Sequence, residues 1–324
     1  MKKLLITSMT LLAACGGSSA AFKDQARDAL PNKSGVGMNS PDGSTAAANA
    51  PKAALTAAPD ATSSDPFFAL TVSVAATFNV PVKVFLDVLA DVAAKEPTSC
   101  TETSCTWGPG SSALDFNTYE LTVSRDPDGE SFDWTLSAQA KSRPASAFVT
   151  VASGVAKPSG TPHHGSGSFT MDFDAAQTLD GTHDATGKLN VTSYSNVGPA
   201  QLAVTYTGAK DANVSTQIDN IAYKFADDTT GGGDLQFALH NTTTGNAVSV
   251  HSRWKNDGSG RADVQGTSGT FNLQDSDCWG PAPFAQVYFT STAVAAPPPF
   301  GGAASGSVTS CAFSTAVFSS LTVQ

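Results

Sequence analysis

The sequence has few charged residues and none of the short motifs typical of well-known catalytic sites. Only 14% of the 324 residues are Asp, Glu, Lys or Arg, and the net charge is −10. Electrostatic binding to nucleic acid or to anionic lipid needs a basic surface, so we expect neither mode of binding. The chain also lacks Gly-x-Ser-x-Gly, a P-loop, Gly-x-Gly-x-x-Gly and His-Glu-x-x-His. We therefore predict a protein that is not an enzyme and that carries no cofactor.

Cysteine is scarce, and its spacing argues against a zinc site. The five cysteines are Cys15, Cys100, Cys105, Cys278 and Cys311. No two of them form Cys-x-x-Cys, and no histidine lies near them in the sequence, as zinc ligands usually would. An odd number in an exported protein leaves one cysteine over. Four cysteines allow three pairings, of which we expect Cys100–Cys105 and Cys278–Cys311 as sequence neighbours in an oxidising compartment.

The leftover cysteine closes an apolar leader. Lys2 and Lys3 precede an apolar stretch over 4–14. This stretch has the length of a secretory signal and is shorter than the roughly 20 residues that a membrane-spanning helix needs. The leader ends in Leu12-Ala13-Ala14-Cys15 and resembles the lipobox of bacterial lipoproteins.

This resemblance implies a signal peptide over 1–14 and acylation, such as by palmitate, at Cys15. Several acyl chains on one residue would anchor the protein stably to a membrane. In that family the residue after the cysteine influences sorting. Gly16 is not an aspartate, so in a Gram-negative cell the family rule implies the outer membrane, at its periplasmic face or at the cell surface.

The leader is followed by a segment with little hydrophobic periodicity. Residues 15–64 are dominated by Ala, Gly, Ser, Pro and Asn. Such a composition buries too little apolar surface to offset the entropy of ordering the chain. We expect 15–64 to be the lipidated cysteine and a disordered tether, with one short helix-prone piece over 22–30 that stops at Pro31.

Residues 65–324 are expected to form a single domain that begins with helix. Asp65 is a candidate N-cap with Pro66 in the first turn, which favours a helix over 66–78. A second, clearer helix is predicted over 82–93. Its apolar stripe consists of Val82, Phe85, Leu86, Leu89, Val92 and Ala93.

After Cys105 the apolar residues alternate with polar ones, which indicates β-strands. The runs begin at Tyr119, Phe132, Phe169, Leu202, Ile221, Leu235 and Val248, and turn-forming sequences separate many of them. We predict a mainly β fold: a curved antiparallel meander or partly closed β-barrel, with the N-terminal amphipathic helix packed on its apolar face. An outer-membrane barrel is less favoured, because the strands are short and the anchor would be redundant.

Three groups of residues are candidates for chemistry, each with a simpler explanation. His163, His164 and His183, with Asp180 and Asp184, would suit a divalent metal if their loops met, but we favour two polar turns. Ser252 and Lys255 match Ser-x-x-Lys without the companion Lys-Thr-Gly, which indicates a chance match. The tryptophans Trp107, Trp254 and Trp279 suit either a sugar platform or the core, and we favour the core.

These observations leave three functional hypotheses. The first is a non-catalytic binding or structural role at the cell envelope, with an envelope protein as partner. The second is a carrier of lipid or another apolar ligand in a half-barrel, which a cavity beside the helix would favour. The third is a hydrolase with an unrecognised site around the histidines.

Overall fold

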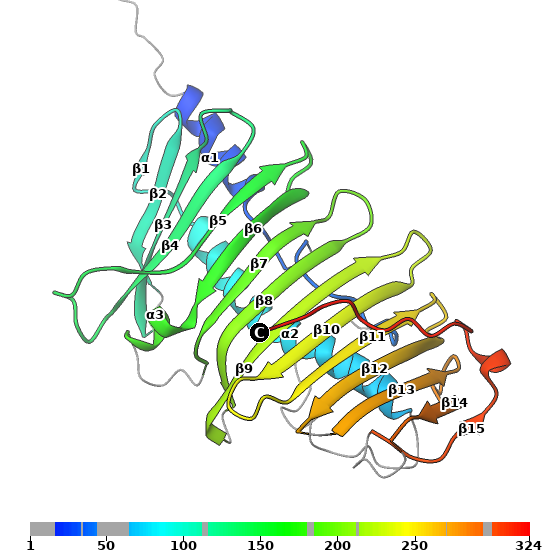
Figure 1. Ribbon diagram of the computed structural model, residues 1–324. Helices are drawn as coiled ribbons and strands as arrows, with labels where there is room; N and C mark the ends of the chain where they lie inside the picture. The colour runs from blue at the N-terminus through cyan, green and yellow to red at the C-terminus, as the bar shows by residue number, and fades with distance from the viewer. Residues whose placement is uncertain are drawn as a thin grey trace, which may run out of the picture.

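The chain forms one open antiparallel sheet wrapped along a long helix (Figure 1). The computed structural model describes residues 17–33, 35–43, 65–111, 116–179, 185–211, 214–269, 271–293 and 300–324. The sheet has 15 strands, and their order in space is their order in the sequence. The predicted mainly β meander is therefore confirmed, as an open sheet and not as a barrel.

The strands are β1 (Ser99–Cys100), β2 (Ser104–Gly110), β3 (Asn117–Arg125), β4 (Phe132–Ala140), β5 (Val149–Pro158), β6 (Gly165–Asp172), β7 (Lys188–Ser195), β8 (Gln201–Asp211), β9 (Val214–Asp227), β10 (Gly233–Asn241), β11 (Ala247–Trp254), β12 (Gly260–Ser268), β13 (Phe271–Trp279), β14 (Gln286–Ser291) and β15 (Ser305–Gly306). The helices are α1 (Gly17–Ala29), α2 (Pro66–Ala93), α3 (Phe173–Gln177) and the 3₁₀ turn η1 (Val308–Ser310).

The helix α2 is a single element of 28 residues, where the sequence had predicted two. Asp65 caps it as expected, because its Oδ1 accepts hydrogen bonds from the N–H groups of Phe67 (2.8 Å) and Phe68 (2.9 Å). Pro81 lies inside the helix and does not end it. By length and composition α2 could cross a membrane. In this fold its apolar side chains form the core instead.

The helix lies along the concave face of the sheet, as predicted, and crosses most of the strands. Three aromatic pairs mark its course by their ring-centroid distances. Phe68 lies 6.0 Å from Trp279 on β13, Phe78 lies 5.7 Å from Tyr223 on β9, and Phe85 lies 6.1 Å from Phe169 on β6. The core is therefore one continuous layer between α2 and the sheet.

Large rings in this layer lie over glycines of the neighbouring strand. Gly154 is the register partner of Trp134, and Gly260 is the register partner of Trp279. A Cβ atom at either glycine would overlap the ring. In each pair the glycine on one strand, which has no side chain, leaves the space that the tryptophan ring of the neighbouring strand occupies.

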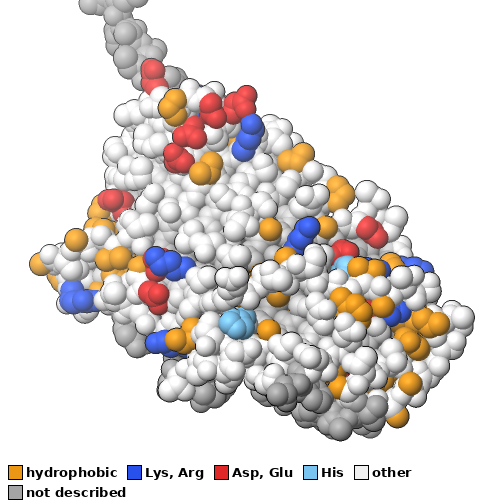
Figure 2. Space-filling model, in the orientation of Figure 1, with side chains coloured by type: hydrophobic (Ala, Val, Ile, Leu, Met, Phe, Trp, Pro, Cys, Tyr) orange, Lys and Arg blue, Asp and Glu red, His pale blue; other side chains and the backbone are white. Residues whose placement is uncertain are grey.

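The convex face is polar and mostly uncharged. One row of register partners crosses seven strands, from β2 to β8, with hydroxyl or amide side chains only: Thr106, Thr122, Thr135, Ser153, Thr170, Asn190 and Thr205. Figure 2 shows acidic side chains gathered at the end of the molecule where α1 lies. The β3–β4 turn, with Asp126, Asp128 and Glu130, adjoins α1 at this end.

Residues 17–33 and 35–43 are part of the folded domain, so the predicted disordered tether is wrong for them, while the helix expected over 22–30 is present as part of α1. Phe22 of α1 is buried and its ring lies 5.9 Å from that of Phe132. Arg27 donates hydrogen bonds to the carbonyl oxygens of Ala93 (2.7 Å) and Lys95 (2.5 Å), so α1 caps the C-terminus of α2. The average hydrophobicity of this segment is low, yet a few of its apolar residues, such as Phe22, pack into the core. Cys15 and residues 44–64 lie outside the described residues.

Two disulfides form as predicted. Cys100–Cys105 joins β1 to β2, and Cys278–Cys311 joins β13 to the C-terminal segment. We call residues 311–324 the C-terminal strap. It runs in extended form across the convex face of β13 to β10 (Figure 1).

Buried charged side chains hold the strap. Asp263 is fully buried and accepts hydrogen bonds from Arg261 (2.8 Å), Arg253 (3.1 Å) and the N–H of Val317 in the strap (2.9 Å). Arg253 also donates to the strap carbonyl of Thr315 (2.9 Å). The strap therefore completes the hydrogen bonding of a charged cluster that would otherwise meet water.

Candidate ligand-binding groove

An apolar groove of about 290 Å³ lies between α2 and the concave face of the sheet. The helix contributes Pro81, Val84, Phe85 and Val88 to one wall. Val84 is 63% exposed, which is high for a large apolar side chain next to a core. The groove is therefore open to solvent along the helix.

Apolar side chains of the sheet and of α3 form the facing wall of the groove. This wall includes Ala138 on β4 and Ala176 on α3, together with Val151 and Met171. Elsewhere along α2 aromatic rings fill the same layer. The helix thus fills the concavity at its N-terminal half and leaves space beside its C-terminal half.

The short helix α3 closes one side of the groove through Asp172. The Oδ1 of Asp172 accepts a hydrogen bond from the N–H of Ala175 (2.9 Å), and its Oδ2 pairs with Lys188 (2.7 Å). Partial burial opposes ionisation, but these two bonds lower the pKa of Asp172 below its usual value. The one charged group that lines the groove in the described part of the chain is therefore a paired carboxylate.

Asn117, the first residue of β3, also borders the groove. Asn117 is 6% exposed, and its Oδ1 has no hydrogen-bond partner. Tyr119, two residues further along the strand, lines the groove as well. A buried, unpaired carbonyl oxygen is unusual in a native protein and calls for an explanation.

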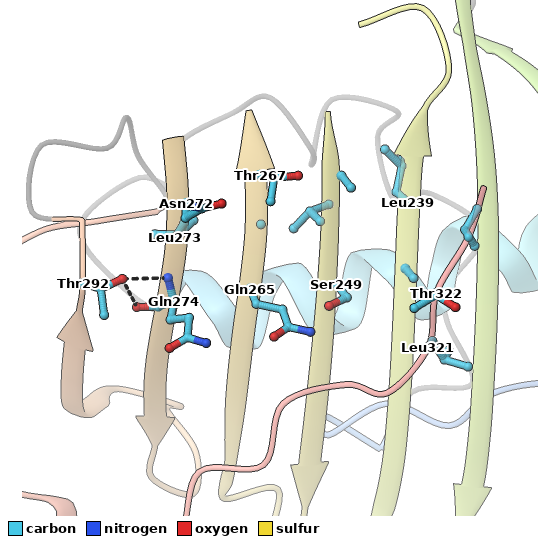
Figure 3. Close-up of a pocket in the computed structure, with 15 residues that line it drawn as sticks. Leu239, Ser249, Gln265, Thr267, Asn272, Leu273, Gln274, Thr292, Leu321 and Thr322 are labelled. Atoms are coloured by element: carbon cyan, nitrogen blue, oxygen red, sulfur yellow. Dashed lines mark hydrogen bonds between the residues drawn. The ribbon is translucent and has the colours of Figure 1, made fainter. Parts of the chain in front are cut away.

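A larger hollow of about 620 Å³ lies on the opposite side of the sheet, between the strap and β10–β14 (Figure 3). Its lining is mixed: the polar side chains include Gln265, Gln274, Asn272 and Thr292, and the apolar ones include Leu239, Val248, Leu273 and Leu321. Water solvates its amide and hydroxyl groups well, so a large part of this lining is satisfied without a ligand. The smaller groove exposes side chains that water solvates poorly, and we take it as the candidate site.

A pair of buried carboxyl groups holds the N-terminus of α2 to β13. Asp65 and Asp277 lie against each other and are 2% and 0% exposed. The Oδ2 of Asp277 accepts a hydrogen bond from Gln286 (2.6 Å), while its Oδ1 and the Oδ2 of Asp65 lack other partners. Burial and the neighbouring Asp65 raise the pKa of Asp277 to about 10. The pair therefore shares a proton at neutral pH.

The histidine group named from the sequence is only partly described. His163 and His164 lie in the β5–β6 turn, where the N–H of His163 donates to the carbonyl of Asp28 in α1 (3.0 Å). His183, Asp180 and Asp184 lie outside the described residues. Within the described ranges, no three His, Cys, Asp or Glu residues are grouped to hold a metal ion.

The Ser-x-x-Lys pair is not brought together. The hydroxyl of Ser252 is buried on the concave side, 2.7 Å from that of Thr71 on α2. The Nζ of Lys255 lies 6.0 Å from the ring of Phe313, in the strap on the convex side. The two side chains therefore cannot act as nucleophile and base.

The tryptophans are core residues. Trp107, Trp254 and Trp279 are all at most 2% exposed. The indole N–H of Trp279 donates to the carbonyl of Gly258 (2.8 Å). None of these three rings is free to stack on a sugar.

No protein-family model, curated protein or solved structure matches the chain.

Proposed function

We propose that this chain is an exported lipoprotein, anchored through Cys15, whose β domain binds one aliphatic chain in the apolar groove without catalysis. The groove beside α2 is the observation that carries the proposal. Between the hypotheses of an envelope-protein partner and an apolar ligand, a space left by the helix favours the ligand.

The size and lining of the groove favour a single aliphatic chain. A dry cavity of about 150 Å³ holds one benzene ring. By proportion, the groove of about 290 Å³ has room for roughly ten carbon atoms. Its walls are largely aliphatic, and the ring of Phe85 among them is stacked on the rings of Trp134 and Phe169. An acyl or alkyl chain of medium length suits this space.

Export and anchoring are supported by the leader and by the disulfides. Two disulfides suit an oxidising compartment outside the cytoplasm. Because α1 begins at Gly17, two residues after Cys15, an anchored domain would lie close to the bilayer. A ligand with an aliphatic chain would then have a short path between the membrane and the groove.

The test uses the full chain with Cys15→Ser, secreted and purified without detergent. Binding is measured by displacement of an environment-sensitive fluorophore with 1-decanol and with 1-chlorodecane. We expect saturable binding, weakened at least tenfold by Val84→Asp, because the charge would lie at the open side of the groove.

Val197→Asp is the matched control. Val197 is 56% exposed in the β7–β8 turn, away from the groove, so this change should leave binding unaltered. Absence of saturable binding, or equal losses in the two variants, would contradict the proposal.

A further inference from the structure

The larger hollow on the convex face presents accessible amide groups from two neighbouring strands. Gln265 on β12 and Gln274 on β13 are register partners, and so are Thr267 and Asn272. Figure 3 shows these side chains next to one another over the hollow. The side chains of Gln274 and Asn272 are exposed and make no hydrogen bond to other described residues. Their donors and acceptors are therefore open to a ligand.

The C-terminal strap forms a fixed side wall of this hollow. The Nε2 of Gln265 donates to the carbonyl oxygen of Ser319 (3.1 Å), and the N–H of Ser320 donates to the Oε1 of Gln236 on β10 (3.2 Å). Leu321 and Val323 follow in the strap and line the hollow with aliphatic side chains. The wall is thus held in place before a ligand arrives, which reduces the entropy lost on binding.

The lining disfavours charged ligands and purely apolar ones. The described residues that line the hollow include no Asp, Glu, Lys, Arg or His. A charged ligand would lose water there without gaining a counter-charge. An aliphatic chain would cover the amides and hydroxyls and leave them unpaired. The lining therefore suits an uncharged molecule that has many hydrogen-bonding groups and some apolar surface.

We infer that the larger hollow is a binding site for a neutral oligosaccharide. Each side-chain amide has two N–H donors and a carbonyl acceptor, so it pairs with a sugar hydroxyl in either direction. The C–H groups of a sugar ring supply the apolar surface that Leu321 and Val323 would contact. The volume of about 620 Å³ lies within the range of roughly 300–1,000 Å³ that ligand sites occupy.

An uncharged peptide suits the hollow less well than a sugar does. Extended peptides gain affinity by pairing their backbone with a free strand edge. The floor of the hollow consists of β11, β12 and β13, and each of these strands is already paired on both sides. Only side chains face the hollow from this floor, so a bound peptide would have no strand edge to extend.

The experiment is an NMR titration of the isotope-labelled full chain with Cys15→Ser. The probes are neutral trisaccharides of glucose, galactose and mannose, a sialylated trisaccharide as the anionic probe, and an end-capped triserine peptide. At least one neutral trisaccharide should shift the side-chain N–H₂ signals of Gln265, Gln274 and Asn272 in a saturable way. Gln274→Leu should weaken its binding about tenfold, because this change removes hydrogen bonds to sugar hydroxyls.

Gln201→Leu is the matched control, since Gln201 is exposed on β8 and does not line the hollow. It should leave the affinity unchanged. Asn272→Leu is a second variant within the hollow and should also weaken binding if Gln274→Leu fails to fold. The inference is wrong if no neutral trisaccharide shifts the amide signals at millimolar concentration, if only the sialylated sugar or the peptide does, or if the hollow variants and the control bind alike. Binding of 1-decanol in the apolar groove should be the same in all these variants, so the proposed function is tested separately.

Discussion

The shared proton of Asp65 and Asp277 makes the stability of the fold depend on pH in an unusual direction. Most buried carboxylates in proteins are paired with cations or N–H donors and lose stability in acid. Here the pKa of Asp277 is raised by burial and by Asp65, so the folded protein keeps a proton that the unfolded chain releases above about pH 4. Stability from this pair is full in acid and is lost as the pH rises toward about 10.

The magnitude follows from proton linkage. When the folded state holds one proton that the unfolded state has released, the free energy of unfolding falls by about 1.4 kcal/mol for each unit by which the pH rises. Between pH 5 and pH 8 the pair should therefore remove up to about 4 kcal/mol, a large part of a typical stability of roughly 5–15 kcal/mol. Asp277→Asn should abolish this slope, since an amide stays neutral and its N–H₂ can donate to Asp65.

The assay is urea unfolding at a series of pH values, followed by fluorescence of the buried tryptophans. We expect the parent and Asp277→Asn to be similarly stable at pH 4, and the variant to be more stable by a few kcal/mol at pH 8. Asp91→Asn, on the exposed side of α2, is the control and should follow the parent. Parallel pH profiles for the parent and Asp277→Asn would refute the shared proton.

Three further predictions concern the anchor, the strap and the disulfides. Cys15→Ser should release the protein from membranes and prevent labelling with radioactive acyl chains; retention on washed membranes would count against the anchor. Asp263→Ala should cost about 3–5 kcal/mol in urea unfolding because it leaves the buried Arg261 and the partly buried Arg253 without their carboxylate. Asp234→Ala, at the half-exposed partner of His251, should cost under about 1 kcal/mol, and equal costs would be contrary to our reasoning. Replacing Cys278 and Cys311 with alanine should lower stability by about 4 kcal/mol, against about 2 kcal/mol for the shorter loop of Cys100–Cys105, and thermal unfolding of both variants decides.

The sequence predicted those strands in which large apolar residues alternate with polar ones. β4 is such a case, with Phe132, Trp134 and Leu136 all buried. The run that starts at Phe169 ends one residue early, because Asp172 caps α3 and Phe173 enters that helix.

Other strands escape this kind of reasoning because their partners hold the large residues. β12 places Gly260 and Ala262 toward the helix and the charged Arg261 and Asp263 toward the strap. Read alone, it resembles a polar loop. Gly260 is small because the ring of Trp279 lies over it, and that information belongs to the neighbouring strand.

The sequence alone could not decide whether the helix fills the concave face of the sheet or leaves a groove beside it. One sequence signal pointed toward it: Val80, Val84 and Val88 repeat every four residues outside the main apolar stripe of the helix. Asn117 gave no such signal, since an asparagine before a strand usually belongs to a turn.

The length of α2 has a consequence for the shape of the whole molecule. A helix of 28 residues is about 42 Å long, yet α2 reaches from β13 and β12 to β3 and β2. Eleven steps between strands of a flat sheet would cover about 53 Å. The helix is thus a chord that is shorter than its arc, and the sheet must bend to stay in contact with both of its ends. Adding a hairpin between β2 and β13 would lengthen this arc, so it would require either a longer helix or a more strongly bent sheet.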